Sequence, residues 1–293
     1  MTKFFLAIIF ILGVSVAQGQ EVREFPMEES SLLWKITGPD MESESYLFGT
    51  MHLIEKEYFL FPKKLQKLVS KTDQLVMEIA GLPNQMDAMK YVMLDEGSFF
   101  DFFNEAQTDT ILRWAKAEFK MEEPAFSAAF SKMKPFVIVQ MATQVQFMGK
   151  TESYEMTFDE IAKEHEIPMK GLETIEQQMS FFDELTDEQQ VEMVMAGIRD
   201  AEESIETMRE MQQTYVSQNV DALYQMINED DGVISEEQAK FLDNRNANWI
   251  PQIKELIKST NSFIAVGAGH LGGPNGVIRL LEKGGYTLTP LKL

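Results

Sequence analysis

Two of the chain's three histidines share a local sequence frame. His52 lies three positions after Gly49 in SYLFGTMHLI, and His270 lies three positions after Gly267 in SFIAVGAGHLGG. The two copies are more than two hundred residues apart, so they are not a local repeat. Each follows an apolar run typical of a strand, and glycine lets the backbone turn sharply at positive φ and approach a ligand closely. Ligands of α/β proteins bind where strands end, so the frame predicts two imidazoles at such a place.

Two imidazoles supplemented by carboxylates suit a divalent metal ion that keeps one position open for water. Glu78 interrupts the apolar run DQLVMEIA, where an unpaired charge would be costly, so it needs a partner. The third histidine, His165, lies in the charged segment AKEHEI and is typical of an ordinary helix face. We therefore expect the metal chemistry at His52 and His270.

Other common chemistries find no support in the sequence. It has no HExxH, no GxSxG, no Walker-type phosphate loop and no cysteine. Gly267, Gly269 and Gly272 spell GxGxxG after an apolar run, but the stretch that follows, TLTPLKL, lacks the acidic residue of a dinucleotide site. Nucleotide binding is therefore disfavoured.

The composition narrows the class of protein and its partners. The chain has 293 residues, of which 44% are hydrophobic, enough for one large domain or two smaller ones. Its formal net charge of -21 repels phosphate groups, which argues against nucleic acid and anionic lipid as partners. Cysteine is absent, so packing or a bound ion must stabilise the fold in place of disulfides.

The first seventeen residues, MTKFFLAIIFILGVSVA, have the pattern of a secretory signal peptide: one lysine, an apolar run and small residues at the end. We expect their removal and a secreted or periplasmic protein; an uncleaved N-terminal anchor is the alternative. No later segment approaches ~18 continuous apolar residues, so no stable membrane span is expected after cleavage.

Strand-like and helix-like patterns divide the remaining chain, 18–293. Apolar runs typical of strands occur near both ends and at 167–173, whereas helical apolar spacing fills most of 81–165 and 186–260. The segments TDEQ and SEEQ each fit a capping box before a long helix. We expect an α/β (α+β) fold in a single domain: a mixed central sheet from the N- and C-terminal segments, with a large helical insert packed on it as a cap.

Five segments together resemble the TraB/PrgY/GumN family, which includes the Tiki metalloproteases: YLFGTMHL, LVMEIA, KGLETIEQQ, LDNRNANWIPQI and FIAVGAGHLGGPNGVIRLLEKGGYTLTPL. The resemblance runs roughly from Leu32 to the end of the chain. The family is known for a paired GxxH signature and for dependence on divalent metals. Its core is similar to erythromycin esterases and heme-binding envelope lipoproteins.

Position by position, the resemblance implies that His52 and His270 are the motif histidines and that Glu78 is the acidic residue ending the next strand. These three residues would hold a divalent ion, with manganese, cobalt or zinc as candidates. Glu78 could instead orient one of the histidines.

Glu173 in GLET, and Arg245 and Asn246 in NRN, match other recurrent family positions. In the mechanism that this implies, Glu173 takes a proton from the metal-bound water and Arg245 stabilises an oxyanion or a substrate carboxylate. Asn246, with Gly49, Gly267 and Gly269, would support the site. Alternatively, Glu173 and Arg245 form a buried ion pair between sheet and cap.

The resemblance favours a secreted or periplasmic metal-dependent hydrolase, in particular a peptidase that uses metal-activated water. The alternative is a non-catalytic envelope protein whose cleft binds heme, a metal ion or a polymer fragment. Unlike the Tiki members, this sequence has no hydrophobic anchor at its C-terminus, so a membrane-tethered peptidase is not implied. The substrate and the oligomeric state stay open.

Overall fold

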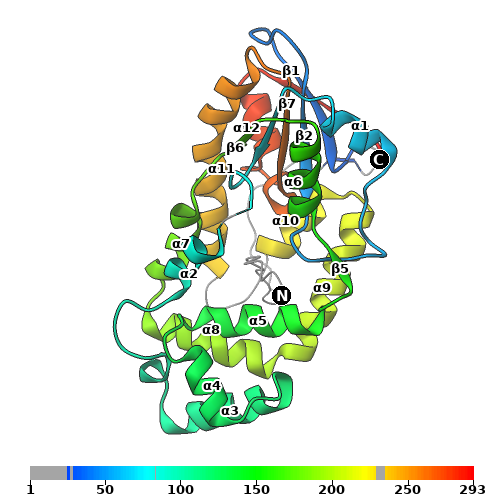
Figure 1. The fold of residues 1–293 in the computed structure, drawn as a ribbon. Coiled ribbons are helices and arrows are strands. Elements are labelled where there is room, and N and C mark those ends of the chain that lie inside the picture. The colour runs from blue at the N-terminus through cyan, green and yellow to red at the C-terminus, as the bar shows by residue number, and fades with distance from the viewer. Residues whose placement is uncertain (1–24, 27–28, 83, 229–234) are drawn as a thin grey trace.

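A six-stranded mixed sheet is the central element of the computed structural model, which describes residues 25–26, 29–82, 84–228 and 235–293 (Figure 1). The predicted signal peptide lies outside these residues. In sheet order the strands are β6 (Met169–Gly171), β4 (Gln74–Met77), β7 (Ser262–Gly267), β2 (Ser45–Thr50), β1 (Leu33–Thr37) and β8 (Thr287–Pro290).

The inner part of the sheet is parallel. β6, β4, β7 and β2 all run in one direction, whereas β1 pairs antiparallel with both β2 and β8. Every residue of β2 and of β4 is buried, and both strands read as near-continuous apolar runs. That is typical of parallel strands covered on both faces, because neither face then needs polar side chains.

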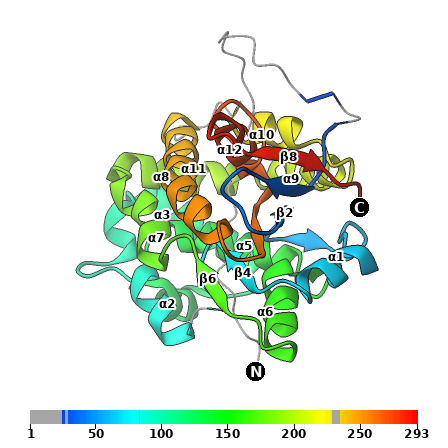
Figure 2. The same cartoon turned by 90° about the horizontal axis from the view of Figure 1, so that it is seen from above.

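Helices cover both faces of the sheet, as is usual for parallel strands, which are joined by crossover connections. α1 (Lys63–Val69) and α6 (Tyr154–Glu164) lie on one face, and α11 (Ser235–Ile257) and α12 (Val277–Lys283) lie on the other (Figure 2). Phe158 of α6 and Trp249 of α11 both belong to the apolar core around the sheet. α6 and the second half of α11 lie in the ranges expected to form the cap, yet they cover the sheet.

The other helices extend the molecule away from the sheet (Figure 1). They are α2 (Gln85–Val92), α3 (Glu105–Glu118), α4 (Glu123–Phe130), α5 (Phe136–Gln146), α7 (Ile175–Glu184), α8 (Asp187–Arg199), α9 (Ala201–Val216) and α10 (Val220–Asn228), with a 3-10 turn η1 (Phe99–Phe102) and a small two-stranded sheet of β3 (Ile54–Glu55) and β5 (Thr151–Glu152). Two apolar cores rich in Phe and Met hold most of them together. α9 and α10 reach back to the core around the sheet through Tyr215 and Leu223.

The predicted α/β class is confirmed, with the sheet built from both ends of the chain and from β6. The capping box at TDEQ is also confirmed, because the Thr186 hydroxyl accepts from the Gln189 N–H and the Gln189 side chain accepts from the Thr186 N–H. The second expected box begins at Ser235, where α11 starts beside residues outside the described part. Within the described residues, no helix is long and apolar enough to cross a membrane.

Candidate functional site at the carboxyl ends of the parallel strands

Each of the four parallel strands ends beside a side chain that the sequence marked for chemistry. His52 follows β2, Glu78 follows β4, Glu173 follows β6, and His270 closes a 3-10 turn, η2 (Ala268–His270), after β7. Parallel strands place their carboxyl ends at one edge of the sheet. Four segments that are distant in sequence are therefore brought to the same edge.

Gly49 and Gly267, the glycines of the shared frame, matter because they lack a side chain. They do not have unusual backbone dihedral angles. The prediction that they use positive φ is wrong: Gly267 has a φ of -52°, and the glycines with positive φ lie at other positions. A Cβ added to Gly49 would lie 2.8 Å from Cδ1 of Leu271 and 3.0 Å from Cα of Ala268. Gly49 thus lets the two histidine segments pack directly against each other.

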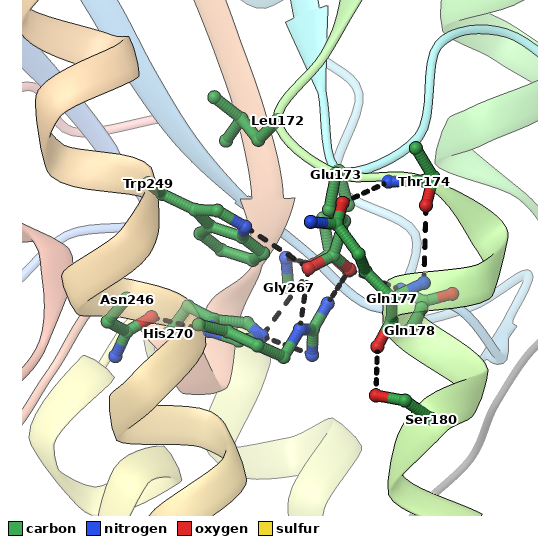
Figure 3. A network of polar contacts seen from close by, with 12 residues as sticks. Leu172, Glu173, Thr174, Gln177, Gln178, Ser180, Asn246, Trp249, Gly267 and His270 are labelled. Carbon is green, nitrogen blue, oxygen red and sulfur yellow. Dashed lines mark hydrogen bonds and ion pairs between the residues drawn. The ribbon is translucent and has the colours of Figure 1, made fainter.

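Arg245 of α11 is the centre of a polar network. Figure 3 shows Glu173, Trp249 and His270 of this network from close by. Nε and Nη2 of Arg245 donate to the two carboxylate oxygens of Glu173 at 3.1 and 2.6 Å. Nη2 also donates to Oε2 of Glu78 at 2.7 Å, and Nη1 lies 3.1 Å from Nε2 of His270. Among the described contacts, four of the five N–H groups of the guanidinium are used, which leaves one on Nη1 for a ligand.

The carboxylate of Glu173 is saturated with donors. Besides the two bonds from Arg245, Oε2 accepts from the indole N–H of Trp249 at 3.2 Å and Oε1 accepts from the amide of Gln178 at 3.1 Å. Burial raises the pKa of Glu173, although the Arg245 guanidinium opposes that rise. With all its acceptor positions occupied, this carboxylate is arranged to hold Arg245 in place.

The pKa of Glu78 is shifted in the opposite direction from that of Glu173. Burial is the largest single influence and alone would raise its pKa, but Arg245, the two histidines and the Gly267 N–H together keep the pKa of Glu78 well below its usual range. Oε1 accepts the backbone N–H of Gly267 at 2.7 Å, and Oε2 accepts from Arg245 and from Gln178. Glu78 is therefore ionised, and Oε1 can accept one further hydrogen bond.

His270 is buried and neutral. The Asn246 amide donates to the carbonyl of Asn275 at 2.9 Å, which leaves Oδ1 of Asn246 as the acceptor for Nδ1–H of His270 at 2.6 Å. Nε2 then carries the lone pair that faces Arg245. Burial and the nearby guanidinium lower the pKa of His270 to about 3. The ring also packs 4.4 Å from that of Trp249, centroid to centroid.

His52 has a different environment, since its side chain is 31% exposed and lies beside a carboxylate. Nδ1 is 2.6 Å from Oε1 of Glu155 at the start of α6. Burial alone would lower the pKa of His52, but the charge and hydrogen bond of Glu155 raise it to about 9, with a smaller contribution from Glu78. Among the described contacts, His52 belongs to this pair and not to the Arg245 network.

One cavity connects the two histidines. It has a volume of about 130 Å³ and is lined at its polar end by His52, Glu78, Gln178, Arg245 and His270. The rest of its lining is mainly apolar and comes from the loop after β2 and from α9, α10 and α11. Glu173 is not among its lining residues. The predicted site residues thus separate into those that face the cavity and those, such as Glu173 and Asn246, that hold them.

A divalent cation does not fit this arrangement. The donor types are suitable, because both histidines anchor Nδ1 to an oxygen, as metal-bound histidines do. However, the guanidinium of Arg245 takes Nε2 of His270 and Oε2 of Glu78, and its charge would repel a cation between them. Among the described residues, no three His, Cys, Asp or Glu side chains are grouped to hold a metal ion. The ligands His52, His270 and Glu78 stay a prediction.

Three residues of the site were missed by sequence reasoning: Glu155, Gln178 and Trp249. Trp249 could have been found, because it lies one helical turn after Arg245 and shares its helix face. Glu155 and Gln178 are about one hundred residues from His52 and Glu78, respectively, so only the fold joins them.

A family model described as the TraB/PrgY/gumN family matches residues 32–290. Neither the curated proteins nor the solved structures contain a match to the chain. The matched range contains all six strands of the sheet and every residue of the polar network. The chain therefore belongs to the TraB/PrgY/gumN family.

Proposed function

We propose that this protein is a hydrolase that cleaves peptide bonds outside the cytoplasm. The observation that supports this most is that an ionised carboxylate, an anchored histidine and a guanidinium N–H all face one cavity. Amide hydrolysis needs an acceptor for a proton of the attacking water, hydrogen bonds to the developing oxyanion, and a proton for the leaving amine. Glu78, Arg245 and His52 are the groups available for these three tasks.

In the proposed reaction, Oε1 of Glu78 accepts a proton from water as the water oxygen adds to the carbonyl carbon. The remaining N–H of Arg245 stabilises the oxyanion. Glu155 anchors Nδ1 of His52 and stabilises the imidazolium, so His52 donates its other proton to the nitrogen as the C–N bond breaks. Exchange of protons with solvent restores both groups.

Glu173 has a positioning task in this proposal. The sequence suggested it as the base, but its oxygens are occupied by Arg245, Trp249 and Gln178. Its bidentate contact fixes the plane of the guanidinium, and thereby the direction of the free N–H. No step is assigned to a metal ion, because Arg245 lies where the ion would bind.

Digestion of a broad peptide library, followed by mass spectrometry, tests the proposal. Replacing Glu78→Gln or His52→Ala should lower turnover by about two to four orders of magnitude, the usual contribution of a positioned acid or base. His165→Ala is the matched control and should cleave at the wild-type rate. A wild-type protein that cleaves nothing, or a fully active Glu78→Gln variant, contradicts the proposed mechanism.

A second candidate is a non-catalytic binding protein, and the apolar lining of the cavity favours it. Eight of the lining residues have large apolar side chains: Met51, Leu53, Met208, Met211, Leu223, Ile227, Phe241 and Leu242. A ligand with an apolar group that fits about 130 Å³, such as the end of a polymer fragment, would use these walls without turnover. Ligand binding by a protein that cleaves no peptide would favour this candidate.

The proposed location outside the cytoplasm rests on the signal-like segment at residues 1–17. Mass spectrometry of the protein recovered from a bacterial envelope fraction should find an N-terminus near Gln18 or Gln20. An N-terminus at Met1 in that fraction would contradict cleavage.

A further inference from the structure

The cavity has two chemically distinct parts. Its polar groups gather where the strands end, at Glu78, Arg245 and the two histidines. The opposite walls come from α9, α10 and α11 and contain Met208, Met211, Leu223, Ile227, Phe241 and Leu242. A ligand that uses both parts must carry a polar, reacting group next to an apolar one.

The walls select against charged groups. Beyond the polar end, the described lining residues are apolar side chains, Thr50, Gln238 and backbone, and none of them supplies a carboxylate or an ammonium group to pair with a ligand charge. An unpaired charge placed there would lose its hydration without compensation. An apolar group would gain by leaving water, roughly in proportion to its buried area.

The volume limits that apolar group to one side chain. The cavity holds about 130 Å³, close to the roughly 150 Å³ of an engineered protein cavity that binds benzene. A leucine, methionine or phenylalanine side chain is of this size. Ile227 limits the space on one side, since a Cβ on Gly269 would lie 2.3 Å from its Cδ1.

We infer that the apolar part of this cavity is a subsite for one large apolar side chain of a peptide substrate, next to the bond that is cleaved. Met208 and Leu223, both almost fully buried, set the depth of the subsite. Met51 and Met211 adapt its shape, because methionine is unbranched and flexible. That the bound peptide is a substrate rests on the proposed hydrolase function. The selectivity of the subsite for apolar side chains does not depend on it.

Binding can be measured without turnover. Titration calorimetry of the Glu78→Gln variant with N-acetyl-leucinamide, N-acetyl-phenylalaninamide, N-acetyl-glycinamide and N-acetyl-aspartamide compares the side chains directly. The leucine and phenylalanine amides should bind at least tenfold more tightly than the other two. Equal affinities for the glycine and leucine amides would overturn the subsite.

Two variants change the subsite in opposite directions. Met208→Ala should deepen it and shift the preference from leucine towards phenylalanine by about fivefold, whereas Leu223→Phe should fill it and reduce the affinity for both. Met195→Ala, a methionine of the cap core outside the cavity, is the matched control and should keep the wild-type preference. Melting curves identify variants that fail to fold. If folded Met208→Ala and Leu223→Phe bind the amides as wild type does, the inference is refuted.

The peptide library separates this inference from the proposed function. Cleavage next to large apolar residues supports both. Cleavage without any side-chain preference refutes the subsite and retains the hydrolase, whereas selective binding of the leucine amide without any cleavage refutes the hydrolase and retains the subsite.

Discussion

His52 and His270 occupy the same sequence frame but have opposite electrostatic environments. His52 is partly exposed beside the carboxylate of Glu155, which favours the imidazolium and raises its pKa to about 9. His270 is buried beside the guanidinium of Arg245, and burial, followed by that guanidinium, favours the neutral ring and lowers its pKa to about 3. Both rings line one cavity.

The difference shows which part of the chain determines each property. The frame of apolar strand, glycine and histidine places each ring at the end of a parallel strand, and does so equally in both copies. The charge of each ring is set by a helix from elsewhere: α6 supplies Glu155, and α11 supplies Arg245 and Asn246. Two chemically different histidines can therefore arise from one local pattern.

Among the substitutions considered, replacing Arg245 should lower the free energy of unfolding most. In Arg245→Met the buried carboxylates of Glu78 and Glu173 lose their cation, and breaking a buried ion pair from one side costs about 3–5 kcal/mol. Denaturant titration should detect this loss of unfolding free energy. Arg199→Met, a control at an arginine that is 61% exposed, should leave the unfolding free energy almost unchanged.

The same variant tests the exclusion of metal. Without the guanidinium, Nε2 of His270 and Oε2 of Glu78 become available to a cation. Arg245→Met should therefore bind Mn²⁺, Co²⁺ or Zn²⁺ more tightly than wild type in calorimetric titrations. Tighter binding by wild type would mean that Arg245 supports a metal site, and would restore the ligands suggested by the sequence.

Disturbing the contact between the two histidine segments at Gly49 should cause the next largest loss of unfolding free energy. A methyl group at Gly49 would meet Ala268 and Leu271 at 3.0 Å or less, with backbone among the contacts, so Gly49→Ala should cost about 1–3 kcal/mol. At the equivalent Gly267, the nearest atom would be Oε1 of Glu78 at 3.3 Å. Gly267→Ala should therefore destabilise the protein less in the same denaturant titration. Equal losses would show that the two glycines have the same role.

The two histidines should also give the stability opposite dependences on pH. His270 has a folded pKa of about 3, below its ordinary 6.5, so its contribution is complete above pH 6.5 and is lost as the pH falls. Between pH 6.5 and 4.5 the slope due to His270 should approach ~1.4 kcal/mol per pH unit, the value for one proton. His270→Gln should flatten this acid limb in denaturant titrations. An unchanged limb would mean that other groups cause it.

Much of this arrangement could be predicted from the sequence because it depends on local patterns. The strands near the start of the chain, the strand before Glu78 and the capping box at Thr186 each depend on neighbouring residues. His52, His270 and Glu173 were placed at strand ends for the same reason, and the family resemblance placed Glu78 at the end of a strand. A parallel sheet then brings these ends together without further information.

Most partner choices could not be predicted, because they depend on contacts across the fold. The buried ion pair of Glu173 and Arg245, which the sequence suggested as an alternative, is the exception, and the structure contains it. Glu173 and Arg245 were both selected, yet only the structure shows that the carboxylate is saturated and turned away from the cavity lining. The link from His52 to Glu155 crosses about one hundred residues. The glycine frame suggested unusual dihedral angles, whereas the structure uses the missing side chain at Gly49 as space.

The smallest expected change in stability comes from Glu155, and it isolates the other histidine. The folded pKa of His52 lies above its ordinary 6.5, so the pair stabilises the protein below pH 6.5 and loses this effect as the pH rises towards 9. Because both side chains are partly exposed to solvent, which weakens the pair, Glu155→Gln should cost less than Arg245→Met at pH 6. The effect of Glu155→Gln on the titration of His52 should be much clearer. The chain has three histidines, so the imidazole proton signals can be followed individually by NMR, with His165→Gln to assign one of them. The His52 midpoint should lie well above 6.5 in wild type and return to about 6.5 in Glu155→Gln. Glu164→Gln, on the same helix, should leave it unchanged. A His52 midpoint that does not move in Glu155→Gln would mean that the two histidines do not owe their difference to their helix-borne partners.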